Sequence, residues 1–198
     1  MVSARLPVAG AGAREARRLQ TRARLYEAAL AEISRRGLAA ADVSAITAEA
    51  GVVRGTFYFH FPTKEHVLAE LERNEEARIV SELGTGAGDV TVVLCELVRQ
   101  VLDAETRLGA TIFRDMLGLH FASTHPIDVE LEQHPLLRFL VGVLRRAQAE
   151  GQVVAAADAE ELATFFLTGL FALLSTGAHD SALLRRYVAT VVKGMEKR

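Results

Sequence analysis

The segment from Asp42 to Lys64 constrains the fold of this chain more than any other part of the sequence. Its first half begins with Asp42, a residue type that caps helix N-termini, and then places apolar residues at helical spacing. These apolar residues are Val43, Ile46 and Ala50. Gly51 follows at once, in the place where a left-handed residue ends a helix. A second short segment follows the glycine, so the pattern predicts two short helices joined by a turn.

The second of these segments can be interpreted in two ways. Residues 56–61 read T-F-Y-F-H-F, an alternating and aromatic run that taken alone predicts a β-strand. We favour a helix, because a two-helix frame encloses the run and no neighbouring segment offers a partner strand. In a helix-turn-helix the second helix enters a DNA major groove while nearby polar groups hold phosphates. The segment therefore points to a DNA-binding function.

The sequence around this segment resembles the DNA-binding domain of the tetracycline-repressor (TetR) family. The resemblance covers about residues 21–71, and it is carried by Ala28-Ala29, Gly37, I-T-A-E-A-G-V-V at 46–53, G-T-F-Y-F-H-F at 55–61 and Lys64. Two positions depart from the family pattern. Thr47 stands where the family has alanine, and Val53 stands where it has the Ser or Thr that caps the second helix. The recognition helix is therefore expected to begin without a side-chain cap.

The resemblance implies a function and a set of contact residues. It implies a ligand-responsive transcriptional regulator, a repressor, which binds palindromic double-stranded operator DNA as a homodimer and is released by a small effector. Positions implied to face bases are Ser44, Arg54, Gly55 and Thr56. Positions implied to contact phosphates are Thr21, Arg22, Tyr58, His60 and Lys64.

The charge distribution agrees with a DNA-binding N-terminal part. The chain as a whole has a formal net charge of −2. Residues 1–64 carry ten Lys and Arg against five Asp and Glu, whereas residues 65–198 carry thirteen against twenty. A basic head on an acidic body directs one end of the molecule toward phosphates. The alternative explanation is a basic N-terminal arm that is simply solvated.

Helical periodicity and capping residues continue through the rest of the chain and predict an all-α protein of about nine helices. The expected organisation is a flexible basic arm at 1–20, a helix-turn-helix domain at 21–66 and a helical ligand-binding and dimerisation domain at 67–198. The first helix is expected at 21–36, and the later ones at 64–83, 89–104, 107–122, 135–150, 158–176 and 181–193. The glycine-rich stretch 84–88 predicts a flexible break.

The last two predicted helices are apolar on nearly all sides and need cover on more than one face. A symmetric dimer with a four-helix bundle supplies that cover, and the resemblance implies one. The expected interface residues are Leu170, Leu173, Leu184, Val188 and Val191. The alternative is a monomer in which the central helices bury both faces.

A ligand pocket is expected in the C-terminal part. Four side chains share one helical face, namely Phe113, Met116, Leu117 and His120. Four more are expected to converge from neighbouring helices, namely Phe139, Val143, Phe165 and Phe166. The resemblance implies a small, largely apolar effector with His120 and Thr111 as polar contacts. The alternative is ordinary core packing.

Other functional classes receive little support. The histidines show no metal-ligand spacing, and the run from His125 to His134 is interpreted as a solvated acidic loop, so no metal or cofactor is expected. The longest apolar run, 162–174, is too short to span a bilayer, and the N-terminus has no apolar signal region. We therefore expect a bacterial cytoplasmic protein that is found at the nucleoid when bound to DNA. The alternative function is a helical small-molecule carrier or enzyme whose basic N-terminal region is incidental.

Overall fold

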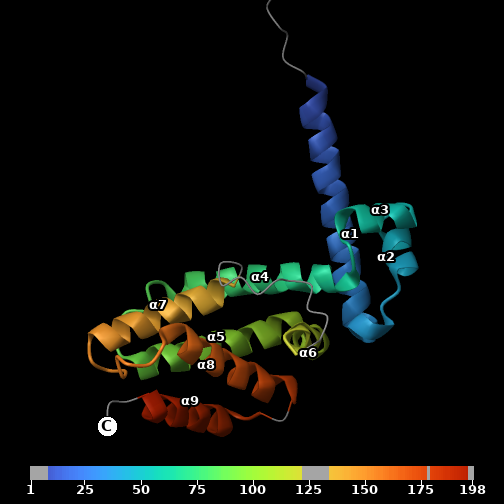
Figure 1. Ribbon diagram of the computed structural model, residues 1–198. Helices are drawn as coiled ribbons and strands as arrows, with labels where there is room; N and C mark the ends of the chain where they lie inside the picture. Colours follow the sequence, from blue (N-terminus) through green and yellow to red (C-terminus); the bar gives the residue numbers. More distant parts are fainter. Residues whose placement is uncertain (1–8, 122–133, 178, 196–198) are drawn as a thin grey trace, which may run out of the picture. The chain divides into compact units, whose positions relative to one another are not determined.

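The computed structural model describes residues 9–121, 134–177 and 179–195 and confirms an all-α protein (Figure 1). These residues form nine helices and no strand. The helices are α1 (Ala9–Ala40), α2 (Val43–Glu49), α3 (Arg54–His60), α4 (Lys64–Leu83), α5 (Val90–Leu108), α6 (Ala110–Leu119), α7 (Pro135–Ala149), α8 (Ala159–Ser175) and α9 (Ser181–Met195). The chain divides into two compact units between Val67 and Leu68, within the first turn of α4.

The first helix is longer than the sequence pattern predicts. Residues 9–20, expected as part of a flexible basic arm, are instead the first turns of α1. Alanine and arginine favour helix, and an ion pair one turn apart joins Arg18 to Glu15 at 2.7 Å. Gly37 interrupts the helical geometry near the other end with φ 76° and ψ 159°. This glycine lets the chain turn before α2, in a conformation that other residues rarely adopt.

Residues 56–60 of the aromatic run are helical and Phe61 is the extended residue that ends α3, because aromatic side chains four residues apart are buried while those between them are exposed. Phe57 and Phe61 are buried on one face, whereas Tyr58 and Phe59 between them are exposed. The two buried rings lie 5.8 Å apart. They belong to a core of the first unit with Leu25, Ala28, Ala29, Val43, Ile46, Ala50 and Val67. Burial of one face outweighs the strand propensity of these residues.

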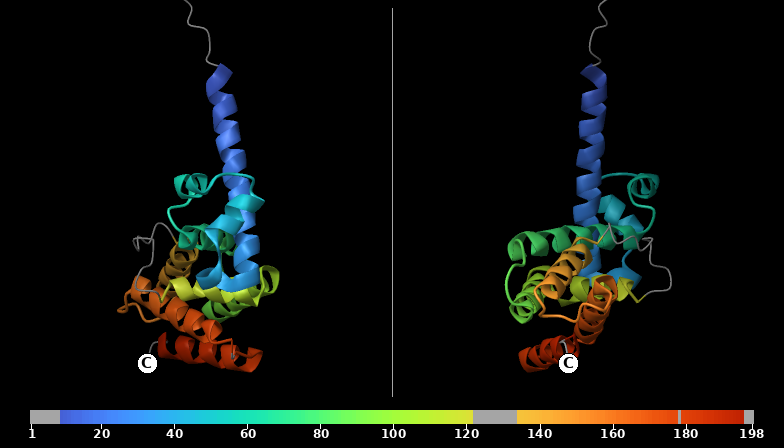
Figure 2. Two further views of the ribbon diagram at one scale, coloured as in Figure 1. Left: turned by 90° about the vertical axis from the view of Figure 1, so that its right-hand side faces the viewer. Right: turned by 60° about the vertical axis from the view of Figure 1, so that its left-hand side comes forward.

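The second unit is a stack of helices in which α5 and α8 lie between α4 and α9 (Figures 1 and 2). Aspartates cap α5 and α8 as expected, since Asp89 accepts from Thr91 N at 2.8 Å and Asp158 accepts from Glu160 N at 2.8 Å. Pro135 opens α7, as predicted. Within the described parts of the chain, no helix is long and apolar enough to cross a membrane.

The glycine-rich stretch 84–88 is a packed turn inside the second unit. The position of a Cβ on Gly86 would lie 2.6 Å from Phe139 Cζ and 2.9 Å from Val143 Cγ2. Arg146 donates to the carbonyl oxygens of Thr85 at 3.0 Å and Gly86 at 2.5 Å. The expected break is therefore held in place by α7, which lies some sixty residues away in the sequence.

Candidate functional site

The helix-turn-helix is built by local capping. Asp42 accepts from Ser44 N at 2.8 Å and so begins α2. Gly51 has φ 66° in the turn, a left-handed conformation suited to glycine. Val53 precedes α3 and makes no side-chain capping bond, which confirms the expectation from the sequence. The start of α3 therefore leaves its first amide groups unsatisfied by a side chain.

Arg54, at the first position of α3, is held by Ser44, an expected base-facing residue, and by Tyr58, an expected phosphate contact. Its Nη1 donates to Ser44 Oγ at 2.5 Å, and its Nη2 donates to Tyr58 Oη at 3.3 Å. Asp42 Oδ1 lies 4.0 Å from Nη1. Just over half of the Arg54 side chain remains exposed. Since a guanidinium has five N–H donors, these bonds orient the group and leave donors for a ligand.

Two apolar side chains, Phe59 of α3 and Val53 just before it, have an exposure that the sequence pattern did not predict. Phe59 is 73% exposed and Val53 is 75% exposed, on the same short segment as the exposed Gly55 and the half-buried Thr56. Large apolar side chains are seldom this exposed without a partner surface. Helical spacing would have found Phe59, because burial of Phe57 and Phe61 places it on the opposite face.

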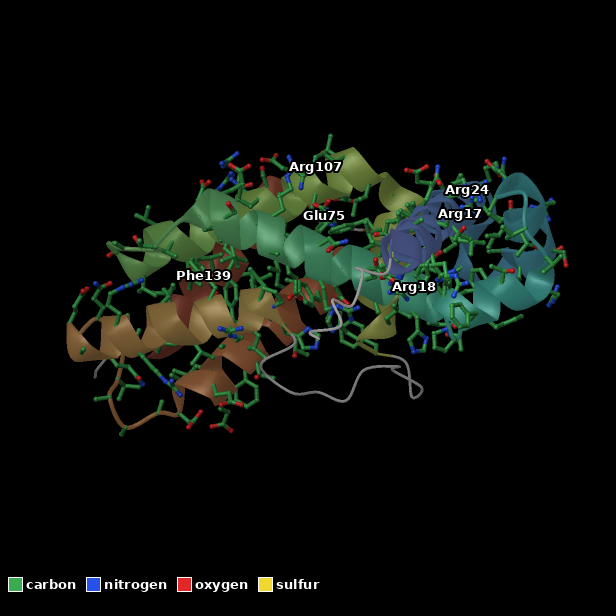
Figure 3. All side chains as sticks on the ribbon, turned by 90° about the horizontal axis from the view of Figure 1, so that it is seen from above. Arg17, Arg18, Arg24, Glu75, Arg107 and Phe139 are labelled. Carbon is green, nitrogen blue, oxygen red and sulfur yellow. The ribbon has the colours of Figure 1, made fainter. Side chains whose placement is uncertain are left out.

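Basic side chains of α1 lie near the C-terminal end of α3. Partial burial lowers the pKa of His60, and the positive charges of Arg18 and Arg22 lower it further. The Arg22 guanidinium also lies 4.7 Å from the centre of the Phe61 ring. Arg17, Arg18 and Arg24 project from α1 into solvent (Figure 3), and Thr21 is half-buried. This side of the first unit has the positive field that phosphates favour.

Lys64 has different partners from those expected of a phosphate contact. Its ammonium donates to three carbonyl oxygens at the end of α1 and the turn after it, at 2.8 Å to Leu38, 3.3 Å to Ala39 and 2.8 Å to Ala41. An ammonium has three N–H donors, so all three are used within the first unit. Lys64 therefore ties the start of α4 to the end of α1.

The second unit contains a cavity of about 270 Å³. It is lined by Glu76, His120, Phe121, His134, Leu137, Thr164, Leu167, Thr168 and Phe171. Of the expected pocket residues, only His120 lines it. Phe113, Met116 and Leu117 line a small neighbouring hollow of about 20 Å³ that shares Glu76 and Phe171 with the cavity.

The remaining expected pocket residues lie elsewhere. Phe139 and Val143 pack on Gly86. Phe166 is buried against α9, with its ring 5.5 Å from the ring of Tyr187, and Phe165 is 62% exposed. Thr111 is half-buried on α6 and lines neither the cavity nor the hollow. The prediction from one helical face thus located one lining residue of the cavity, His120.

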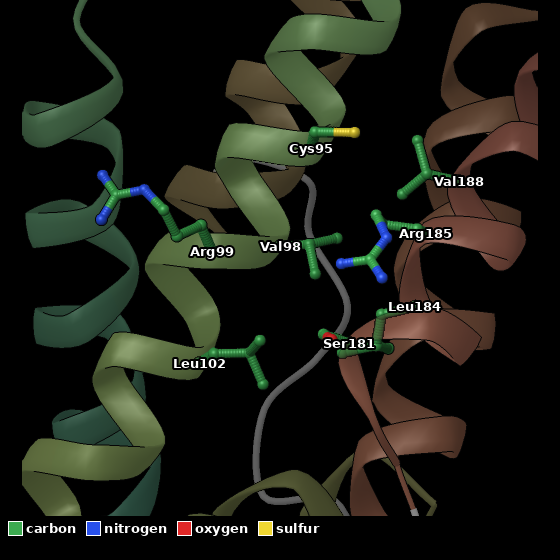
Figure 4. Close-up of a pocket in the computed structure, with 8 residues that line it drawn as sticks. All are labelled: Cys95, Val98, Arg99, Leu102, Ser181, Leu184, Arg185 and Val188. Carbon is green, nitrogen blue, oxygen red and sulfur yellow. The ribbon is translucent and has the colours of Figure 1, made fainter.

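Three of the expected dimer residues are buried within the single chain. Leu184 and Val188 of α9 face Val98 and Leu102 of α5 across a groove of about 220 Å³ (Figure 4). Leu170 is buried in α8, whereas Leu173 and Val191 are half-buried. The exposed Cys95 also lines the groove. Much of the apolar surface of α8 and α9 is therefore covered by the chain itself.

Comparison with known proteins agrees with this geometry. Residues 25–71 match the family described as bacterial regulatory proteins, tetR family. The HTH-type transcriptional regulator YdgC of Bacillus subtilis (strain 168) is 34% identical over 104 residues. That match covers 46% of this chain and spans about half, 53%, of the relative.

Solved structures of similar fold cover most of the chain. FadR of Thermus thermophilus, a TetR-family transcriptional repressor in complex with lauroyl-CoA, has a TM-score of 0.68 at 22% identity and covers 89% of this chain and 96% of its own. RolR in complex with resorcinol has a TM-score of 0.67 at 21% identity, and the match covers 91% of this chain and 90% of RolR. The helix-turn-helix at residues 25–71 therefore matches the TetR family of bacterial regulatory proteins, and most of the chain shares the fold of these solved structures.

Proposed function

We propose that this protein is a transcriptional repressor that binds a palindromic operator as a homodimer and releases it when a small effector binds. The observation that carries the proposal is the position of Arg54, exposed at the start of α3 and oriented by Ser44 and Tyr58. An oriented guanidinium at the end of a helix that fits a major groove can read guanine through two hydrogen bonds. In this proposal the protein acts in the bacterial cytoplasm, on nucleoid DNA.

The proposed DNA contacts divide into two groups. Ser44, Arg54, Gly55 and Thr56 face base edges, and the exposed ring of Phe59 contacts a thymine methyl group. Thr21, Arg22, Tyr58 and His60 contact phosphates, supported by the arginines of α1. Lys64 contributes by holding the end of α1 rather than by donating to a phosphate.

The proposed effector site is the cavity of the second unit. Two proteins of similar fold have small molecules in their structures, lauroyl-CoA in one and resorcinol in the other. Here Glu76 of α4 lines the cavity, and Lys64 at the start of the same helix holds α1. An effector that favours another position of α4 shifts the population away from the DNA-bound spacing of the two recognition helices.

The proposed dimer forms through the surface of α8 and α9 that the chain leaves uncovered. Phe165 and Ala172, seven residues apart on α8, are exposed on one helical face. Leu173 and Val191 are half-buried and complete the apolar edge. Two copies joined here would make a four-helix bundle.

Selection of bound sequences from random duplex DNA tests the proposal. We expect an inverted repeat whose half-site centres are separated by one helical turn, about 10 base pairs, or by a multiple of it. A carrier or enzyme with an incidental basic region would enrich no sequence and would bind all duplexes with the same salt dependence. That result would refute the regulator and support the alternative.

A further inference from the structure

We propose that the effector of this protein is an organic cation, a small compound in which an apolar body carries a protonated amine. This inference rests on the proposed function, because it assigns a ligand class to the cavity of the second unit. Two buried glutamates at the cavity and the hollow beside it have too few hydrogen-bond donors among the described residues.

Two glutamates of α4 are buried at the cavity and the adjoining hollow. Glu72 is 3% exposed and Glu76 is 6% exposed, one helical turn apart. Glu76 lines both spaces, and Glu72 lines the hollow. Removal of a carboxylate from water is costly unless hydrogen bonds and opposite charge replace the water. Two buried carboxylates on one turn of a helix therefore need hydrogen-bond donors or positive charges close to them.

The partners that the described residues supply are incomplete. One oxygen of Glu72 bonds His120 Nε2, while Oε2 is buried without a hydrogen-bond partner among the described residues. Among the described residues, Glu76 Oε2 accepts a long hydrogen bond from Leu136 N at 3.3 Å, and Oε1 lies 3.6 Å from His134 Nδ1. A buried acceptor without a donor destabilises a protein. The site thus has unused capacity to accept N–H donors.

Permanent positive charge is missing from the described part of the cavity walls. Among the described residues that line the cavity or the hollow, none is a lysine or arginine. The described lining residues that can carry positive charge are His120 and His134; a hydrogen bond to Glu76 raises the pKa of His134, whereas the nearby charge of Arg73 lowers it. A ligand that brings its own positive charge supplies N–H donors to Glu76 on the cavity wall and, through the adjoining hollow, to the unpartnered oxygen of Glu72.

The other walls fit the body of such a ligand. Phe121, Leu137, Leu167 and Phe171 supply apolar surface, and the His120 ring lies 4.9 Å from the Phe171 ring. Thr164 and Thr168 are exposed at the edge of the cavity, which gives a ligand a route from solvent. Aromatic faces also attract ammonium groups. An anionic ligand would instead bring a like charge toward Glu72 and Glu76.

Calorimetric titration of the full chain at neutral pH with three matched probes tests the inference. The probes share one body and differ in the head group: 4-phenylbutylamine, 4-phenylbutanol and 4-phenylbutanoate. We expect the amine to bind about tenfold or more tightly than the alcohol, and the carboxylate to bind most weakly. Equal affinity for amine and alcohol, preference for the carboxylate, or no amine binding up to about 1 mM would overturn the inference.

Substitutions assign the preference to the carboxylates. Glu72→Gln should reduce the affinity for the amine about tenfold and leave the alcohol unchanged. Glu82→Gln, the same change at an exposed site on α4, should alter neither. An amine preference that survives Glu72→Gln and Glu76→Gln would overturn the assignment. If these variants fail to fold, the probe comparison on the unchanged protein still decides the ligand class.

DNA binding measured on the same preparations separates this inference from the proposed function. Sequence-specific DNA binding without amine preference would overturn the cation effector and leave the regulator intact. Amine preference without DNA binding would overturn the proposed regulator and would still support a cavity that binds organic cations. Release of the selected duplex by the amine, and not by the alcohol, would support both.

Discussion

Two basic residues that the sequence places together, Arg54 and Lys64, have different surroundings. Arg54 keeps more than half of its side chain in solvent and is oriented by the hydroxyl groups of Ser44 and Tyr58. Lys64 is half-buried and donates to three backbone oxygens. The family resemblance located both residues, but it could not separate a contact to DNA from a contact to the chain's own backbone. That difference sets separate expectations for the two alanine variants.

Arg54→Ala should lower the affinity for the selected operator by about 1–3 kcal/mol and relax specificity at one base position in each half-site. The reason is the loss of a paired hydrogen bond to a base edge. Fluorescence anisotropy with operator and with random duplexes measures the effect. Arg145→Ala, on the exposed side of α7, is the matched control. If affinity for both duplexes falls equally, Arg54 contacts a phosphate instead.

Lys64→Ala should lower the free energy of unfolding by about 1–3 kcal/mol, because carbonyl groups at the end of α1 lose a charged donor. Thermal unfolding compared with Arg78→Ala, which removes an exposed charge from the same helix, measures this. An unchanged melting temperature together with a salt slope reduced by about one per half-site would contradict the account. Lys64 would then be a phosphate contact.

At the scale of helices, local signals located most elements. Asp42, Asp89 and Asp158 are caps in the sequence and in the structure. Two segments differ from the sequence prediction. Residues 84–88, predicted to be a flexible break, are held by a distant contact to α7. Helix α5, predicted to end at residue 104, continues to Leu108 and ends at Gly109, with φ 80°. The cavity was the least predictable feature, since its walls come from α4, α7 and α8 as well as from His120 at the end of α6. Spacing along one helix gives no information about which helix faces it.

The contact between α8 and α9 depends on one glycine. A Cβ on Gly169 would lie 2.5 Å from Tyr187 Oη, and that hydroxyl donates to Phe166 O at 2.6 Å. Burial raises the pKa of Tyr187 to about 12, as expected for a phenol held away from water. Gly169 therefore allows a close approach of α8 and α9 within one chain.

Gly169→Ala should lower the free energy of unfolding by about 1–3 kcal/mol, because the methyl group displaces the Tyr187 ring. Gly142→Ala on α7 is the control, since no described atom lies within 4 Å of the point that its new methyl group would occupy, and alanine favours helix by about 1 kcal/mol. Denaturant unfolding of both variants measures the difference. If both variants gain stability, the glycine is not needed for the approach of Tyr187.

For the whole molecule, assembly depends on which apolar residues the single chain leaves uncovered. Leu184 and Val188 face α5, so a charge there would destabilise the subunit before it could report on dimerisation. Phe165 is exposed on α8 and is the informative position. The sequence predicted two strongly apolar helices correctly, but it could not tell which face the rest of the chain would cover.

Phe165→Glu should leave the melting temperature of the isolated subunit nearly unchanged and produce a monomer that binds the palindrome weakly. The reason is that a carboxylate at an apolar interface meets no partner charge. Light scattering at low micromolar concentration measures the mass, with Thr190→Glu on the exposed side of α9 as a control. A dimer that persists in Phe165→Glu would place the interface elsewhere.

The central claim is that α3 reads a DNA sequence, and the most direct test is the affinity of the unaltered protein for two duplexes of equal length and composition. One duplex carries the selected inverted repeat and the other a scrambled version of it. At physiological salt we predict that the repeat is bound at least about 10³-fold more tightly than the scrambled duplex. Equal affinities for the two duplexes would contradict the claim, because binding would then depend on phosphate charge alone.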